Sequence, residues 1–235
     1  MTDLKLLINI YEALQSEQSD FDLQTAVIAL MRSEAKTLAM QSDTNLIAQQ
    51  HPLGFLACRW LLGNGQALRL HLWSKEFGWA QEPGWEIHNH VFSFSSRILL
   101  GVLKNQVYEV DEITQPSCGG HTVYEVTYND SESRMTPIRR GGVMRLISSS
   151  IESVGARYSM EVGVFHSSEL ISDRALTVLA TYVDDASQIV PRVISTHQRE
   201  SISFDRSSIS KTIVSNLLSE FAIHVESGAN QSQHA

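Results

Sequence analysis

The sequence predicts a mainly β protein, an antiparallel sandwich or barrel with helices at both ends. Three observations lead to this class. Short runs of β-forming residues follow one another from about Phe55, turn-forming stretches such as GNG, PSCGG, NDSES and RRGG separate them, and helical spacing of apolar residues occurs only before and after them. Because no helical pattern intervenes between the strands, the sequence disfavours a βαβ fold.

The N-terminal segment, residues 1–50, is predicted to be helical. Apolar residues recur at helical spacing in two stretches, first at Leu4, Leu6, Leu7, Ile10, Tyr11 and Leu14, then from Leu23 through Ala26, Val27, Leu30 and Met31 towards Leu38. Asp20 or Asp22 is placed to cap the second helix, because a short acceptor side chain satisfies the free amides of a first turn. We expect both helices to pack on the outside of the β domain.

The β domain is predicted to span residues 51–206. Its strand-like runs, in chain order, are ALRLHLW, WEIHNHVFSF, SRILLGVLKNQVYEV, HTVYEVTYN, GVMRLISS, ARYSMEVGVFH and ALTVLATYV. The stretch SSISKTIVSNLLSEFAIHV then returns to helical spacing and predicts a C-terminal helix over 207–225, with Ser207 or Ser208 as its cap. The polar residues 226–235 are expected to form a disordered tail.

The composition narrows the class of protein. With 43% hydrophobic and 19% charged residues the chain is expected to be globular. A net charge of -8 disfavours a nucleic-acid or anionic-membrane surface, and no apolar run approaches the ~20 residues of a membrane span. Cys58 and Cys118 show neither a disulfide framework nor zinc-ligand spacing, and no leader pattern is present, so we expect a soluble, cytoplasmic protein.

Two histidines stand one residue apart in the stretch GWEIHNHVFSF. In a strand, side chains alternate, so His88 and His90 would project from one face together with Glu86. Two imidazoles on one strand can hold a divalent ion if a third ligand arrives from a neighbouring strand, and His166, at the end of a later β-like run, could supply it. The alternative is that the pair consists of ordinary surface histidines.

These residues resemble a known family. The stretch IHNHVFSFSSRILLGVL is similar to the first metal-binding motif of the cupins, an H-x-H followed at a set distance by the glycine of a turn, here Gly101, and His166 matches the lone histidine of the second cupin motif. Most cupins have a glutamate between the H-x-H pair and that glycine, whereas this chain reads VFSFSSRILL. A three-histidine pattern resembles the thiol dioxygenases, and the likeness to cysteine dioxygenase continues upstream through CRWLLGNGQALRLHLW, over residues 57–182 in all.

The resemblance implies a double-stranded β-helix, or jelly-roll, barrel with a ferrous iron held by His88, His90 and His166. Three neutral ligands would leave positions open for a substrate and dioxygen. The resemblance also implies that Arg59 pairs with the substrate carboxylate, a bidentate task suited to a guanidinium, and that Tyr182 is the catalytic tyrosine.

The chain departs from this family beside the expected tyrosine. Val178 and Ala180 stand at the alternate positions where the family has a serine and a histidine that support the tyrosine. The cysteine that some members cross-link to the tyrosine has no counterpart, since the region contains Phe94 and Ser95. These differences speak against thiol oxidation, but they do not affect the three predicted metal ligands.

Other residues leave two interpretations open. Arg59 could instead stack beside Trp60, and Tyr182 could be an ordinary strand tyrosine. Glu86 could be a fourth ligand or be solvated, and His71 could face the site or be a hydrogen-bonded barrel histidine. The RRGG stretch at 139–142 could clamp an anion or form a solvated turn. The aromatic side chains that could line a substrate pocket or form core are Trp73, Trp79, Trp85, Phe92 and Phe94.

Three functions fit the sequence. The first is a non-haem iron dioxygenase that acts with dioxygen on a small carboxylate-bearing metabolite, for which a thiol is an analogy only. The second is a non-catalytic barrel that binds a small ligand, with terminal helices that could mediate a homodimer. The third is a metal-dependent isomerase or hydrolase with zinc, nickel or manganese, because a site of three imidazoles accepts several divalent ions.

Overall fold

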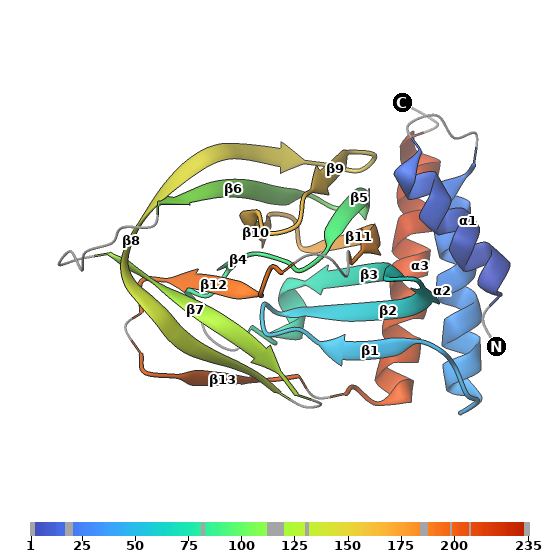
Figure 1. Ribbon diagram of the computed structural model, residues 1–235. Coiled ribbons are helices and arrows are strands. Elements are labelled where there is room, and N and C mark those ends of the chain that lie inside the picture. The colour runs from blue at the N-terminus through green and yellow to red at the C-terminus, as the bar shows by residue number, and fades with distance from the viewer. Residues whose placement is uncertain are drawn as a thin grey trace.

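The computed structural model describes residues 3–16, 21–80, 83–111, 120–129, 132–183, 188–197, 199–206 and 208–232. In this part of the chain, two antiparallel sheets face each other and three helices lie together on one side of the molecule (Figure 1). The prediction of a mainly β fold with helices at both ends is therefore confirmed. In the described residues no helix is both long and apolar enough to cross a lipid bilayer.

The first sheet has six strands in the order β1-β2-β3-β11-β5-β9. Their bounds are β1 Ile47–Gln50, β2 Phe55–Gly63, β3 Gln66–Ser74, β5 Ser93–Leu100, β9 Arg157–Met160 and β11 Arg174–Tyr182. A short 3₁₀ helix, Lys75–Phe77, follows β3. The central strand β11 inserts between β3 and β5, so residues far apart in the chain form the middle of this sheet.

The second sheet has seven strands in the order β13-β8-β6-β10-β4-β12-β7. Their bounds are β4 Ile87–His88, β6 Leu103–Asp111, β7 His121–Tyr128, β8 Glu132–Glu152, β10 Phe165–Leu170, β12 Arg192–Ser195 and β13 Ile202–Asp205. The long strand β8 pairs with β7 through its first half and with β6 through its second half. The chain of pairings therefore closes on itself through β8, which bends around one end of the molecule (Figure 1).

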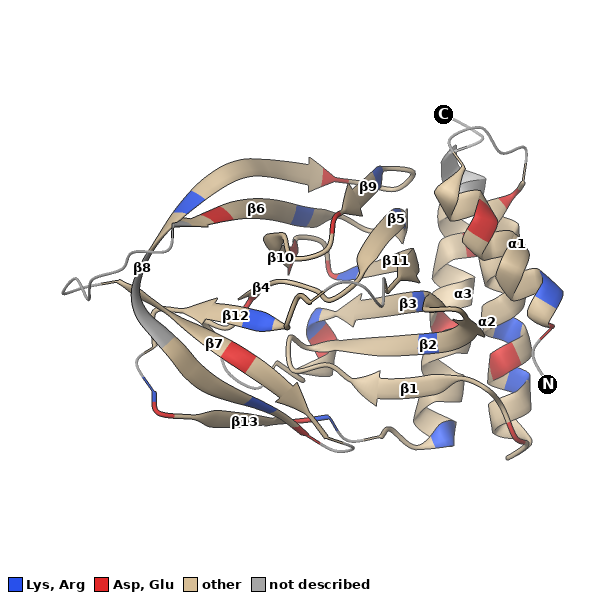
Figure 2. Cartoon of the chain, in the orientation of Figure 1, with Lys and Arg blue, Asp and Glu red and all other residues tan. Residues whose placement is uncertain are grey.

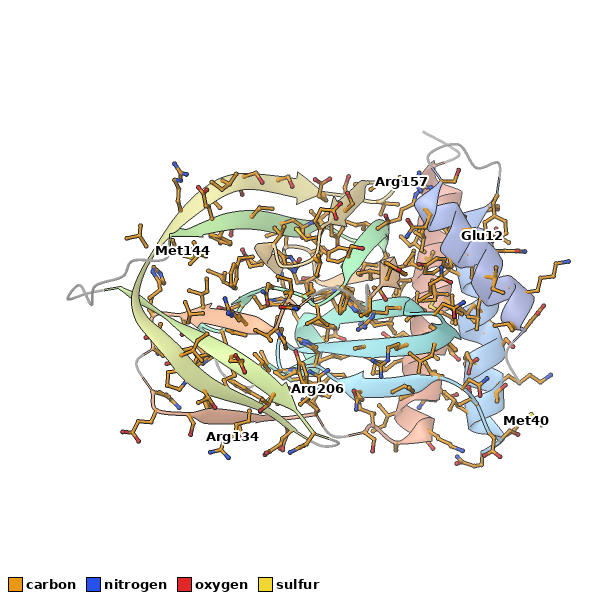
Figure 3. The ribbon with its side chains drawn as sticks, viewed as in Figure 1. Glu12, Met40, Arg134, Met144, Arg157 and Arg206 are labelled. Carbon is orange, nitrogen blue, oxygen red and sulfur yellow. The ribbon has the colours of Figure 1, made fainter. Side chains whose placement is uncertain are left out.

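The helices cover the outer face of the six-stranded sheet. Their bounds are α1 Leu4–Gln15, α2 Leu23–Ala39 and α3 Lys211–Ser232, and their apolar faces pack against buried residues of β2, β3 and β11. Arg157 of β9 donates hydrogen bonds to the carbonyl groups of Ala13 and Leu14 at the end of α1, which satisfies acceptors that the helix leaves free (Figure 3). The opposite face of this sheet, turned to the second sheet, forms the interior.

The caps and ends of the helices differ in part from the predictions. Asp22 caps α2, with its carboxylate accepting from the amide of Thr25 at 3.0 Å, while Asp20 lies outside the described residues. At α3 the cap is Ser210 rather than Ser208, because the helix begins only at Lys211; Ser207 also lies outside the described residues.

The element boundaries also differ at three places. Residues 47–50 of the predicted helical segment form β1, which pairs with β2. The RRGG stretch is not a turn, because its backbone continues β8 and pairs with β7. Residues 226–232 of the predicted tail are helical, and Glu226 makes an ion pair with Arg32 of α2 that extends the contact between the two helices.

Gly101 forms the turn between β5 and β6 at a positive φ of 77°. A Cβ at this position would overlap the carbonyl oxygen of Arg174 and lie 2.9 Å from the Cα of Ala175, both backbone atoms that cannot rotate away. We expect Gly101→Ala to cost more than the about 1–2 kcal/mol of a left-handed L residue, measured as the free energy of unfolding in urea.

Gly155 offers the matched control for this substitution. It has a similar φ of 88°, but a Cβ added here would meet no atom within 4 Å. Gly155→Ala should therefore lower the free energy of unfolding only by the cost of the left-handed backbone conformation. Equal losses at the two glycines would mean that the close approach at Gly101 does not limit the fold.

Candidate metal centre

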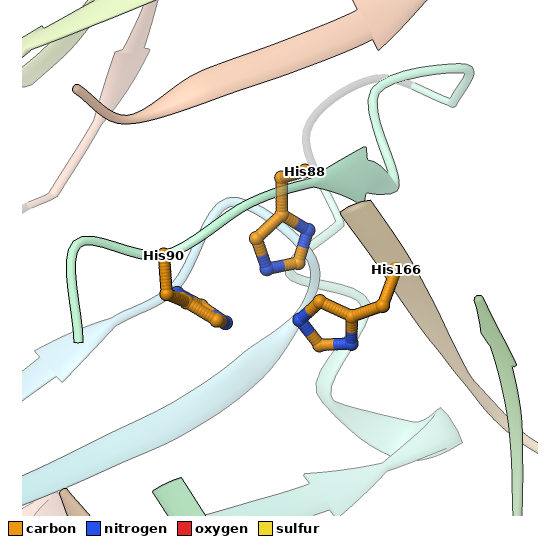
Figure 4. Close-up of side chains that lie close together, drawn as sticks. All are labelled: His88, His90 and His166. Atoms are coloured by element: carbon orange, nitrogen blue, oxygen red, sulfur yellow. The ribbon is translucent and has the colours of Figure 1, made fainter. Parts of the chain in front are cut away.

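His88, His90 and His166 lie together in the interior (Figure 4). His88 in β4 and His166 in β10 are direct partners across the two strands, and His90 follows β4 by two residues. The ring centroids are 4.7 Å apart for His88–His90 and His88–His166, and 5.0 Å apart for His90–His166. Sequence spacing predicted this group, and the structure brings all three residues together.

The ligand nitrogens of the three imidazoles all lie within 4.8 Å of one another. Two ligand nitrogens of a tetrahedral, zinc-like ion would be about 3.4 Å apart, given bonds of about 2.1 Å. Small side-chain rotations would therefore bring the three nitrogens onto one ion. The donor set of three imidazoles suits iron, zinc, copper or nickel.

The hydrogen bonds leave nitrogen atoms free for a metal. The Nδ1 of His88 lies 2.8 Å from the carbonyl oxygen of Glu86 and donates to it, so Nε2 is left as the ligand atom. Both ring nitrogens of His166 are buried and make no hydrogen bond in the structure. An unpaired buried polar atom costs about 1–3 kcal/mol, so a metal bound to His166 would offset a cost that the fold otherwise carries.

Burial sets the protonation state of the three residues. It lowers the pKa of His88, and it lowers the pKa of His90 and His166 well below the ordinary value, with the neighbouring imidazoles adding to the effect. Neutral imidazole is the form that binds metal ions. The site is thus prepared for a cation without first losing protons.

Aromatic rings enclose the group on the side of the first sheet. Phe92 stacks on His90 with 4.5 Å between the ring centroids. The ring centroid of Phe94 lies 5.7 Å from that of His90 and 5.9 Å from that of His166. These two members of the aromatic set line the site. Such rings keep water away from an ion and strengthen electrostatic interactions with it.

The three tryptophans of that set lie elsewhere. Trp73 packs on Phe55 in the core between the sheets, and Trp85 packs on Tyr124 at the wall of a small pocket that reaches His88. Trp79 stacks on Phe77 of the 3₁₀ helix, and it lines a second pocket of about 510 Å³ together with residues of β6 and β10. Only Trp85 therefore borders the surroundings of the histidines.

Arg59 faces the interior but does not contact the histidines through any described hydrogen bond. It stands directly opposite Arg69 of β3. Arg69 comes nearer to the site, because its guanidinium lies 4.3 Å over the ring of Phe92, which stacks on His90. Sequence reasoning missed Arg69, although the alternation that turned His71 inward also turns Arg69 inward.

Tyr182 is not brought to the histidines. It is 44% exposed at the end of β11, on the strand face of Val178 and Ala180 that packs on the helices, and its charge adds to the burial that raises the pKa of Tyr11 in α1. The residue of β11 that faces the interior at this level is Thr181, which accepts a hydrogen bond from Arg69. The catalytic role predicted for Tyr182 therefore finds no geometric support, for reasons of strand alternation.

The structure also places Glu86, His71 and the backbone of the RRGG stretch. Glu86 is exposed, and its carboxylate accepts from the amide of Gly84, so it is not placed as a ligand. His71 faces the interior between Phe55 and Trp73, and burial, followed by the charge of Arg69, lowers its pKa to about 3. The backbone of RRGG lies in β8, and its side chains are outside the described part of the structure.

Comparisons with known proteins give structural likeness alone. No protein-family model and no curated protein matches the sequence. Solved structures that it resembles include an oxalate decarboxylase from Bacillus subtilis, with a TM-score of 0.35 and 13% identity over 60% of this chain and 29% of that one.

Two further similar structures are a dioxygenase and a globulin. Hydroquinone 1,2-dioxygenase from Sphingomonas sp. TTNP3 has a TM-score of 0.32 and 10% identity over 71% of this chain and 80% of that one. Procruciferin, an 11S globulin from Brassica napus, has a TM-score of 0.32 and 13% identity over 69% of this chain and 35% of that one. The chain spans about a third of the length of the oxalate decarboxylases.

Proposed function

We propose that the protein is a metal-dependent enzyme of the cupin type, a non-haem iron dioxygenase that acts on a small carboxylate-bearing metabolite. The observation that carries this proposal is the group of three imidazoles, two of them half-buried and one buried, neutral at physiological pH, in which His166 makes no hydrogen bond within the described structure. Ordinary core histidines satisfy at least one ring nitrogen, which His166 does not.

Each residue of the site has a role in this proposal. Ferrous iron held by the three histidines would supply the one-electron chemistry that dioxygen requires, at positions that the protein leaves open. The carbonyl of Glu86 orients His88, and Phe92 and Phe94 exclude water from the reacting groups. Arginines on the interior face hold the substrate by its acid group.

Two alternatives use the same residues differently. The three imidazoles could hold zinc, nickel or manganese and catalyse an isomerisation or hydrolysis without dioxygen. The barrel could also bind a small ligand without catalysis. The predicted partners, a small substrate and dioxygen, the cytoplasmic location and a homodimer remain part of this proposal as predictions.

Metal analysis followed by oxygen uptake tests the proposal. Protein purified without added metal is analysed for its elements, then stripped and reloaded anaerobically with Fe(II), Mn(II) or Zn(II), and oxygen uptake is recorded with a panel of small carboxylic acids, thiol acids among them. We expect substrate-dependent uptake with Fe(II) and none with Zn(II). Turnover with Zn(II) and without oxygen would favour the hydrolase or isomerase, and failure to retain any of the ions would favour the ligand-binding barrel.

A further inference from the structure

Three arginines, Arg59, Arg69 and Arg206, lie close enough for their charges to interact, and we call them the interior arginines. Arg69 and Arg206 each approach one histidine of the candidate metal centre. Cys58 and Trp60 of β2 are fully buried against the helices, so strand alternation turns Arg59 to the opposite face, the interior. Arg59 and Arg69 are direct partners in the pairing of β2 with β3. Like charges directly opposite each other destabilise a sheet, and this pair therefore calls for a compensating charge.

Arg69 is held in place beside His90. Its guanidinium lies 4.3 Å over Phe92, its Nε donates a long hydrogen bond of 3.4 Å to the hydroxyl of Thr181, and Phe92 stacks on His90 at 4.5 Å. One aromatic ring thus separates a fixed cation from a metal ligand. Burial, and then the charges of Arg59 and Arg206, lower the pKa of Arg69 to about 10.

Arg206 approaches the site from the other side. It follows β13 directly, and two residues later Ser208 bridges to Gln49 of β1, so this segment passes from the second sheet to the first (Figure 3). Its guanidinium donates to the hydroxyl of Ser133 at 3.2 Å and lies 4.9 Å from the ring of Tyr128. Arg206 and His88 line the same pocket.

The interior arginines have no acidic partner among the residues that the structure describes, since none of them makes an ion pair there with an aspartate or glutamate. Acidic residues outnumber basic ones by 26 to 18, and Figure 2 shows them interspersed with basic ones over the helices and the seven-stranded sheet. Partly buried cations without a counterion are costly, so an anion from solution would be bound favourably.

The pocket limits the size of the group that can bind at Arg206. Arg192, His51 and Asn89 line it beside Arg206 and His88, together with apolar groups such as Trp85, Met135 and Phe204, and its volume is about 50 Å³. A water molecule needs roughly 10–15 Å³ by this measure, so there is room for one acid group. Arg69 does not line this pocket, so a second acid group would have to extend beyond it to reach Arg69.

We propose that the substrate of this site is a small dianionic acid, with one acid group at Arg69 beside Phe92 and the other at Arg206 beside Tyr128. Three guanidinium groups, two of them directly opposite each other in the sheet and one in the pocket of His88, carry more positive charge than a monocarboxylate offsets. The inference rests on the proposed function in that it assigns the substrate class to the same site. A dicarboxylate and a phosphate-bearing acid share the required chemistry.

Binding to the metal-free protein tests this proposal separately from catalysis. Calorimetric titrations compare succinate with butyrate, which has the same four carbons and one acid group, and with inorganic phosphate. We expect succinate to bind at least about tenfold more tightly than butyrate, as one additional charged hydrogen bond implies. Tighter binding of phosphate than of succinate would assign the dianion to a phosphate-bearing acid, and the reverse order to a dicarboxylate.

Variants locate the two acid groups. Arg69→Met and Arg206→Met should each weaken succinate by about tenfold or more and reduce its advantage over butyrate, whereas Arg69→Lys should restore part of the affinity. Arg134→Met, at an exposed position of β8, is the matched control and should bind as the wild type does (Figure 3). Thermal melts check that each variant is folded.

Equal affinity for succinate and butyrate would overturn the proposal, as would an Arg206→Met protein that prefers succinate as strongly as the wild type does. Either result leaves the metal and oxygen experiments untouched. Conversely, a preference for dianions in a protein that retains no metal would reject the dioxygenase and keep the anion site. The two proposals therefore fail separately.

Discussion

Replacing His166 by alanine is expected to empty the metal site while the sandwich stays folded. His166 supplies the ligand from β10, and neither of its ring nitrogens has another partner. Loss of a residue that only supports a ligand lowers metal affinity about 10–100-fold, so loss of a ligand itself should cost at least the upper end of that range. Elemental analysis and competition with a chelator measure the loss, and His88→Ala and His90→Ala should behave alike.

The control for this substitution is His121→Ala. His121 is the first residue of β7, and strand alternation puts it on the face opposite the buried Tyr124. Its removal should leave the metal content unchanged, and circular dichroism should show the same β signal in all four variants. A His166→Ala protein that retains the ion at wild-type affinity would mean that the ion lies elsewhere.

Acidification is expected to destabilise the metal-free protein steeply. His71 has a folded-state pKa of about 3, lowered by burial first and then by the charge of Arg69, and burial also lowers the pKa of His51 well below its ordinary value. Above pH 6.5 these imidazoles are neutral in both states, and stability is complete. As the pH falls from 6.5 towards 3, only the unfolded chain takes up the proton, so stability is lost by up to about 1.4 kcal/mol per pH unit and group.

Urea denaturation at pH 7 and pH 5 measures this loss. Between these values His71 alone should account for about 2 kcal/mol of the decrease in unfolding free energy. In His71→Gln the decrease should be smaller by that amount, whatever the substitution costs at pH 7. His121→Gln serves as the control. The same pH dependence in wild type and His71→Gln would show that His71 can be charged in the folded protein.

The sequence predicted the parts of the site that depend on strand alternation within one run. His88 and His90 were expected on one face, and the structure places them there. His71 was left between two roles, and the structure turns it inward beside Phe55. The positions of α1 and α2 were also predicted from the periodicity of apolar residues, because each of these helices has one apolar face.

Tyr182 illustrates what periodicity could not decide. From Ala175 to Thr181 every residue of β11 is buried, because helices cover one face of the strand and the second sheet covers the other. With both faces buried, alternation gives no clear sign of which residues point to the interior. The sequence alone could therefore not tell that Thr181, rather than Tyr182, faces inward.

Arg69 and Arg206 were missed for a different reason. The role of each depends on partners distant in sequence, such as Phe92 for Arg69 and Ser133 for Arg206. The RRGG stretch has turn-forming composition, yet its backbone is held in β8 by pairing with β7. Tertiary pairing overrides local preference in such cases.

The short strand β4 determines when in folding the metal site can form. It consists of Ile87 and His88 only, and it is held between β10 and β12, which arrive much later in the chain. Contacts between such distant segments form slowly, since long loops must close first. The ligand set therefore exists only once these late segments have docked. A metal ion could therefore not serve as a folding nucleus here, and if bound it would act by slowing the unfolding of chains that have already reached the native state.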